Sequence, residues 1–353
     1  DDPSAATRTI SFTVNDGDAD SNTVTRDITV APVNDAPVEA SIEAGALAYT
    51  ENDGAVAVTS TLALSDVDDV DLESAVVQIS GNYVSGEDVL TFTNQNGITG
   101  SWDAGTGTLT LTGTSSVANY EAALQSITYT NGSDDPSAAT RTVSFTVNDG
   151  DADSNTVIRD IEITPVNDAP VEANIEAGAL AYTENGGAVA VTSALTLSDI
   201  DDVDLESAVV AITGNYVNGE DILTFTNQNG ITGVWDAGTG TLTLTGTSSV
   251  ANYQAALQSI TYTNGSDDPS NATRTVSFTV NDGDADSNTV ARDITVAPVN
   301  DAPVEASIEA GALAYTENDG AVPITSTLTL SDVDDTDLES AVVQITGNYV
   351  NGE

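Results

Sequence analysis

Val33-Asn34-Asp35-Ala36-Pro37 occurs three times in this chain, returning at residues 166–170 and 299–303, each time 133 residues further along. Proline stiffens the backbone and cannot donate a ladder hydrogen bond, while Asn and Asp favour turns and offer oxygen ligands. These properties suit a joint between folded units better than the interior of a strand or helix. We therefore interpret the pentapeptide as a hinge between repeats.

The same period runs through the rest of the chain, which predicts a tandem array and not one large domain. Residues 36–168 differ from residues 169–301 at 16 of 133 positions, so the copies are recent duplicates. The predicted divisions are the C-terminal part of a repeat at 1–35, complete repeats at 36–168 and 169–301, and the N-terminal part of a repeat at 302–353. We expect the sequence to be a window on a longer protein.

The composition excludes several classes of function. The chain has 56 Asp and Glu against 6 Arg, a formal net charge of −50, and no Lys, His or Cys. This charge argues against nucleic acid as a partner, and the missing residues remove disulfides, thiol chemistry and the commonest zinc ligand. Carboxylates duplicated in every repeat suit mechanical repetition better than catalysis, so we predict no enzyme. No run of about 18 apolar residues occurs, which predicts no membrane insertion within this sequence.

Apolar and polar residues alternate over short segments, which is the period of half-buried strands. The strands expected in the first complete repeat cover residues 41–50, 55–64, 75–83, 88–93, 98–102, 108–112, 127–129, 140–147 and 156–164. Ser115–Leu124 has the single helical signature, with Ser at the cap and an apolar stripe. The pattern predicts an all-β fold, an antiparallel immunoglobulin-like β-sandwich with one short crossover helix per repeat.

Two loops of each repeat place acids at alternate positions. In the first complete repeat, one loop holds Asp66, Asp68, Asp69 and Asp71, and the other holds Asp149, Asp151 and Asp153. Because successive turns of a sandwich alternate between its two ends, both loops should lie near Asn34 and Asp35. Calcium takes roughly six to eight oxygen ligands, and alternate acids can turn several of them to one point. We predict calcium binding here; the alternative is a solvated acidic loop.

The order of these motifs carries a family resemblance. Tyr49-Thr50-Glu51, Leu64–Asp68, Phe145–Gly150 and the joint together resemble the cadherin-like tandem repeats of giant secreted bacterial adhesins of the RTX-adhesin type. In cadherins the linker, the paired Asp of the second loop and the Asp of the last hairpin bind calcium with a Glu from the preceding domain. The resemblance implies Asn34, Asp35, Asp66, Asp68 and Asp149 at the first joint; Glu51, Asn167, Asp168, Asp199, Asp201 and Asp282 at the second; and Glu184, Asn300, Asp301, Asp332 and Asp334 at the third.

The chain departs from the family at the joint itself. Pro32, Pro165 and Pro298 stand where the family's linker has an acid, and the second Asn of that linker is missing. An acidic pair of the family has no clear match either, since Glu121 becomes Gln254 in the next copy. We therefore expect fewer calcium ions per joint than in cadherins, about one or two.

The resemblance implies an extracellular, calcium-stiffened rod, a stalk or fibre for cell adhesion or biofilm matrix, whose repeats are one another's partners. Two alternatives stay open. Each sandwich could be an adhesive module that binds glycan or protein by avidity, with Trp102 as a candidate contact, or the chains could self-assemble into filaments. Trp102 and Trp235 could instead be packing residues of a hairpin. Binding to a cell-surface glycan or protein could also reside in other domains.

Overall fold

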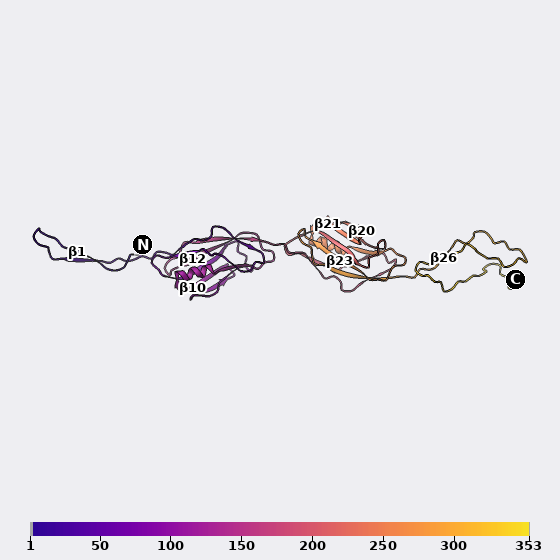
Figure 1. Ribbon diagram of the computed structural model, residues 1–353, viewed down its shortest axis with the longest axis horizontal. Coiled ribbons are helices and arrows are strands. Elements are labelled where there is room, and N and C mark those ends of the chain that lie inside the picture. The colour runs from indigo at the N-terminus through magenta and orange to yellow at the C-terminus, as the bar shows by residue number, and fades with distance from the viewer. Residues whose placement is uncertain (1–2, 353) are drawn as a thin grey trace. The chain divides into compact units, whose positions relative to one another are not determined.

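Strands dominate the chain, and the all-β prediction is confirmed. The computed structural model describes residues 3–352 and divides into two units, Asp1–Val166 and Asn167–Glu353. Each unit contains one full set of sandwich strands and one short helix (Figure 1). The division falls inside the second joint, and the repeat boundaries at residues 35, 168 and 301 stay a prediction.

The elements between residues 38 and 164 of the first unit and between residues 171 and 297 of the second occur in the same order. Those of the first unit are β1 (Arg8–Phe12), β2 (Val24–Ile28), β3 (Val38–Ala40), β4 (Leu47–Thr50), β5 (Val56–Ala57), β6 (Ala63–Ser65), β7 (Asp71–Gly81), β8 (Asp88–Thr91), β9 (Thr99–Asp103), β10 (Thr108–Ser116), α1 (Val117–Gln125), β11 (Thr128–Asn131), β12 (Arg141–Asn148) and β13 (Val157–Thr164). Those of the second unit are β14 (Val171–Ala173), β15 (Leu180–Thr183), β16 (Val189–Ala190), β17 (Thr196–Ser198), β18 (Asp204–Gly214), β19 (Asp221–Thr224), β20 (Thr232–Asp236), β21 (Thr241–Ser249), α2 (Val250–Gln258), β22 (Thr261–Asn264), β23 (Arg274–Asn281), β24 (Val290–Ala297), β25 (Val304–Ala306) and β26 (Thr329–Ser331).

The full repeat of the first unit is a sandwich of two main sheets. One has the strand order β4-β13-β12-β7-β10-β9 and the other β5-β11-β8, while β3 and β6 form a separate pair. Inward side chains of both sheets share one core, in which Val77, Leu109 and Phe145 of the larger sheet meet Leu90 and Tyr129 of the smaller. The second unit repeats this arrangement as β15-β24-β23-β18-β21-β20, β16-β22-β19 and β14-β17.

The single helix of each repeat connects the two sheets. Helix α1 follows β10 of the larger sheet and precedes β11 of the smaller, so it is the crossover that the sequence predicts (Figure 1). Ser116 is its cap, since the hydroxyl accepts a hydrogen bond from the Asn119 backbone N–H at 3.3 Å. Tyr120 and Leu124 are buried on the helix face that carries the apolar stripe. Neither helix in the described part of the chain has the length and apolar character needed to cross a membrane.

One strand pairing differs from the antiparallel prediction. Strand β4 runs parallel to β13, with Leu47 opposite Ile161, and β15 runs parallel to β24 in the same way. Apolar and polar residues alternate in the same way in parallel and antiparallel strands, so the alternation does not determine the direction of pairing. The expected strand at 41–50 is also shorter: Ser41, with a φ of 58°, follows the end of β3, the chain bends at residues 44–45, and β4 begins at Leu47.

A buried ion pair links the two sheets. The side chains of Arg141 in β12 and Asp88 in β8 are both 0% exposed, and Arg141 Nε lies 3.2 Å from Asp88 Oδ2. Asp88 also accepts hydrogen bonds from the Tyr129 hydroxyl at 2.6 Å and from Asn131 Nδ2 at 2.8 Å. Arg141 Nη1 donates to the Ser137 carbonyl at 2.6 Å, which holds the connection that leads into β12. The ion pair therefore connects the two sheets to each other and to the loop before β12.

Strand β10 contains a bulge at Gly113. Its register against β7 shifts between Thr112 and Ser115, and Gly113 has a φ of 128°. A Cβ at this position would collide with the Gly97 carbonyl oxygen. Only glycine fits there without strain, because its backbone reaches this region and it has no side chain.

Candidate metal centre

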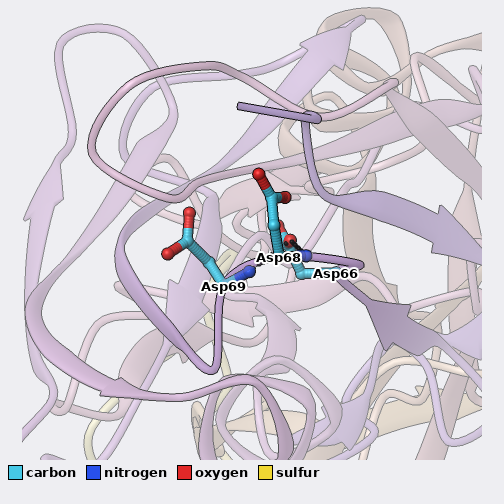
Figure 2. A group of neighbouring side chains, drawn as sticks. All are labelled: Asp66, Asp68 and Asp69. Atoms are coloured by element: carbon cyan, nitrogen blue, oxygen red, sulfur yellow. Dashed lines mark hydrogen bonds between the residues drawn. The ribbon is translucent and has the colours of Figure 1, made fainter. Parts of the chain in front are cut away.

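The loop after β6 folds around its first aspartate. Asp66 Oδ1 accepts hydrogen bonds from the backbone N–H groups of Asp68 at 3.1 Å and of Asp69 at 2.9 Å. This turn brings one carboxylate oxygen from each of the three residues within 4.8 Å of the others. Figure 2 shows the three side chains on their loop. Three negative oxygens so close together repel one another unless a cation or a proton lies among them.

The same carboxylate group recurs in each copy of the loop. Asp199, Asp201 and Asp202 form it in the second unit, and Asp332, Asp334 and Asp335 form it again near the third joint. In all three groups the first aspartate accepts both backbone N–H groups of the following turn, at distances of 2.9–3.4 Å.

Several oxygens of these groups have no hydrogen-bond donor. The buried and unpartnered atoms are Asp66 Oδ2, Asp199 Oδ2, Asp201 Oδ1 and Asp334 Oδ1. A buried carboxylate oxygen without a partner costs free energy unless a proton or a cation compensates it. Carboxylate oxygens are the ligands that a hard divalent cation prefers, so this set fits calcium.

Each joint is bonded to this loop through its aspartate. The Asp35 backbone N–H donates to the carboxylate of Asp68, at 3.3 Å to Oδ1 and 3.2 Å to Oδ2. At the second joint the Asp168 N–H donates to Asp201 Oδ2 at 3.0 Å. The third joint repeats the bond, from the Asp301 N–H to Asp334 Oδ2 at 2.9 Å. One carboxylate of the group therefore also positions the joint.

The joint asparagines reach the second acidic loop. Asn34 Nδ2 donates to Asp149 Oδ2 at 3.0 Å, and Asn167 Nδ2 donates to Asp282 Oδ2 at 3.0 Å. Burial would raise the pKa of Asp149, but the hydrogen bonds from Asn34 and from backbone N–H groups outweigh it, and the pKa is lowered. Asn300 instead donates to the backbone carbonyl of Asp301.

The two acidic loops lie close enough to interact. Partial loss of hydration, followed by the negative charges of Asp66, Asp68, Asp149 and Asp151, raises the pKa of Asp69. Both loops of the repeat thus contribute negative charge to one place. This convergence is the one that the alternation of turns predicts from the sequence.

Glu51 and Glu184 lie at the C-terminal joints of their own repeats. Glu51 Oε2 accepts the Val166 backbone N–H at 2.8 Å, and Glu184 Oε2 accepts the Val299 N–H at 2.8 Å. Both side chains are buried, with exposed fractions of 6% and 4%. Each glutamate therefore holds the first residue of the joint that leaves its repeat.

The structure groups the residues proposed from the sequence only in part. Asp66 with Asp68, Asp199 with Asp201 and Asp332 with Asp334 share a carboxylate group. Within residues 3–352, the proposed residues outside these groups are Asn34, Asp35, Glu51, Asp149, Asn167, Asp168, Glu184, Asp282, Asn300 and Asp301. The proposed set also omitted a third member of each group, Asp69, Asp202 and Asp335. The Asp-x-Asp-Asp spacing would have indicated this third member, because the backbone N–H of the third aspartate donates to the carboxylate of the first.

Trp102 packs inside its repeat. Its ring meets that of Tyr83 edge to face, with centroids 6.2 Å apart, and both rings lie against the core. Trp235 and Tyr216 make the same contact in the second unit. A ring engaged in this way favours packing over a role as a platform for sugars.

Comparisons with known proteins give one partial sequence match and several distant structural similarities. No protein-family profile matches it. Halomucin of Haloquadratum walsbyi is 37% identical over 87 residues, a match that spans 23% of this chain and 1% of Halomucin. Similar solved structures include the protocadherin gamma B4 extracellular domain, at 15% identity and a TM-score of 0.31 over 93% of this chain and 45% of that one. Protocadherin gamma B2 extracellular cadherin domains 1–5 match at 14% identity and a TM-score of 0.31 over 95% and 53%.

Proposed function

We propose that this chain is a tandem array of cadherin-like repeats, covering residues 36–168 and 169–301, that calcium stiffens into a rod. In this proposal the array is an extracellular stalk or fibre, of the kind that giant bacterial adhesins of the RTX type use to project an adhesive tip or to build a matrix. The repeats of one chain are then each other's principal partners.

The unpartnered carboxylate oxygens carry this proposal. These oxygens recur in every copy of the Asp-x-Asp-Asp loop. A carboxylate of the same loop also accepts a hydrogen bond from the backbone N–H of the joint aspartate. Asp66, Asp68 and Asp69 would hold the cation in the first unit, and their counterparts would do so in the others. A bound cation would relieve the repulsion in the group and fasten the loop that positions the joint.

The proposal includes an extracellular location, where a site of modest calcium affinity would be filled. Extracellular modules bind calcium with dissociation constants of about 0.1–1 mM, a range that suits the calcium concentration outside cells. At about 10 mM calcium, such a site contributes roughly 1.4–2.7 kcal/mol to the bound conformation. That free energy is enough to convert a mobile joint into one held mostly in a single conformation.

Small-angle scattering during a calcium titration tests the proposal. We expect calcium, but not magnesium, to reduce the flexibility of the chain and to extend it. The variant D199N/D201N should lose this response at one joint. The matched control is D267N/D268N, which removes two charges from exposed positions whose carboxylates make no hydrogen bond. A wild-type profile that is the same in chelator and in calcium would refute the proposal.

A further inference from the structure

The strand that follows each joint turns a glutamate inward. In β3 the flanking residues Val38 and Ala40 are exposed, whereas Glu39 is 3% exposed. Glu172 has the same place in β14 and is also 3% exposed. An inward strand position between two exposed ones normally holds an apolar residue. A carboxyl group at that position, in both complete repeats, therefore requires a physical account.

Neither buried carboxyl group has a side-chain partner. The Oε atoms of Glu39 and of Glu172 make no hydrogen bond of normal geometry to the described part of the chain, and only the backbone N–H groups of Val157 and Val290 act on them weakly. The backbone of Glu39 is well bonded instead: its N–H donates to Asn155 Oδ1 and its carbonyl accepts from Asn155 Nδ2, both at 2.9 Å. Asn288 makes the same two bonds to Glu172. The Asn155 or Asn288 amide thus holds the strand backbone on both sides, while the carboxyl side chain beneath it is buried with only weak compensation.

Within residues 3–352 no arginine forms an ion pair with either glutamate: Arg159 of β13 pairs with Glu43, and Arg292 of β24 pairs with Glu176. Strand β6, which pairs with β3, consists of Ala63-Leu64-Ser65 and has no ionisable side chain. The segment that leads into β13 places two uncharged residues, Asn155 and Val157, beside Glu39. Helix α1 packs on β6 and presents Glu121, whose Oε2 accepts the Leu64 N–H at 3.0 Å.

The second repeat shows that Glu121 is not the cause. Its counterpart Gln254 is neutral and makes the same bond, from the Leu197 N–H to Oε1 at 3.0 Å. Burial nevertheless raises the pKa to about 7 for both Glu39 and Glu172, opposed only in part by a nearby backbone N–H. Desolvation, which is common to both repeats, is therefore the physical cause.

We propose that Glu39 and Glu172 are proton-operated latches, which fasten the strand after each joint to its repeat when neutral and release it when ionised. The neutral carboxyl group can stay beneath the strand. The carboxylate must regain water, and it can do so only if the strand lifts from its neighbours. Strand β3 is three residues long and lies directly after Pro37, so its release frees the segment that anchors the joint.

The direction and the window of the effect follow from the two states. The ordinary pKa of the glutamate carboxyl group is 4.5, and its pKa in the closed strand is about 7. The closed form binds the proton more tightly, so its advantage is complete below pH 4.5 and falls as pH rises toward 7, above which it is constant. The opening equilibrium should therefore increase by roughly 300-fold per latch across this window.

Two measurements on the whole chain in chelator test the latch. Side-chain carboxyl NMR should show Glu39 and Glu172 titrating near pH 7, and hydrogen exchange of peptides that contain β3 and β14 should accelerate, after correction for the intrinsic rate, between pH 5 and 8. The variant E39Q/E172Q should lose this acceleration. The control E162T replaces an exposed glutamate with threonine, the residue at the equivalent position of the second repeat, Thr295. This control should behave as wild type.

Either of two results would overturn the latch. One is titration of both glutamates near 4.5, which is read on the wild-type chain and does not depend on the stability of any variant. The other is an unchanged exchange profile in a folded E39Q/E172Q. Because these measurements exclude calcium, they are independent of the proposed cation sites, and E39Q/E172Q should keep its scattering response to calcium.

Discussion

Removal of Asp88 should strongly destabilise the first repeat. The side chain of its partner Arg141 is 0% exposed, so the Asp88→Ala substitution leaves an uncompensated guanidinium group in the core. Breaking a fully buried ion pair in this way costs about 3–5 kcal/mol. The substitution also deprives the Tyr129 hydroxyl and the Asn131 amide of their acceptor. We therefore expect about 4 kcal/mol or more, a large part of the stability of a domain of this size.

A second ion pair in the same repeat is the matched control. Arg159 Nη1 and Glu43 Oε2 are 3.1 Å apart, but their side chains are 12% and 21% exposed. Water reaches both ions when the pair is broken, so the ion pair itself contributes about 1 kcal/mol or less. Glu43 also accepts hydrogen bonds from the Thr59 hydroxyl and from the hydroxyl and N–H of Ser60, so Glu43→Ala should cost about 1–2 kcal/mol in all. The comparison sets a fully buried Arg–carboxylate pair against a partly exposed one of nearly the same separation.

Urea unfolding of the whole chain provides the assay. The second repeat keeps its own buried pair, Arg274 with Asp221 at 3.1 Å, and serves as an internal reference. With a denaturant slope of about 2 kcal/mol per molar, Asp88→Ala should move the transition of the first repeat about 2 M lower and leave the other in place. A shift as small as that of Glu43→Ala would refute the reasoning. The double variant D88L/R141M should recover most of the loss, since two apolar residues leave no unpaired charge.

The remaining predictions concern a turn, a modification and acid stability. Gly113→Ala should cost about 2 kcal/mol or more in unfolding free energy, whereas Gly132→Ala, where a Cβ meets open space, should cost much less. The sequence has three formal glycosylation sequons, at Asn131, Asn264 and Asn271; Asn271 is exposed and the other two are buried, so peptide mass spectrometry after expression in a glycosylating host should find glycan on Asn271 alone. Hydrogen bonds from two hydroxyls and backbone N–H groups outweigh burial and lower the pKa of Glu43 to about 2. Its contribution to stability is therefore present above pH 4.5 and lost as pH falls toward 2, and Glu43→Gln should flatten acid unfolding curves in that window.

The candidate site was partly readable from the sequence because its acids belong to short loops with a fixed spacing. Asp66 and Asp68 are two residues apart, so any turn there brings them together, and the alternation of sandwich turns places Asp149 at the same end. Asp69 was recognised as part of the acidic loop but left out of the proposed ligands, because its place in the group depends on a turn in which its own N–H bonds to Asp66. The inward position of Glu39 was also invisible, since Val38-Glu39-Ala40 reads equally well with the glutamate facing water.

The local pattern of apolar residues predicted most strands of the complete repeats. Whether a segment with that pattern forms a strand depended on the presence of partner strands. The nine residues Asp-Leu-Glu-Ser-Ala-Val-Val-Gln-Ile occur at 71–79 and again at 337–345. In the first place they form β7, between β10 and β12, and Val77 is 0% exposed. In the second place none of the described strands pairs with the segment, which is not a strand, and Val343 is 86% exposed. An alternating sequence has two faces by itself, but its ladder hydrogen bonds and its buried side must come from neighbours that only the tertiary structure supplies.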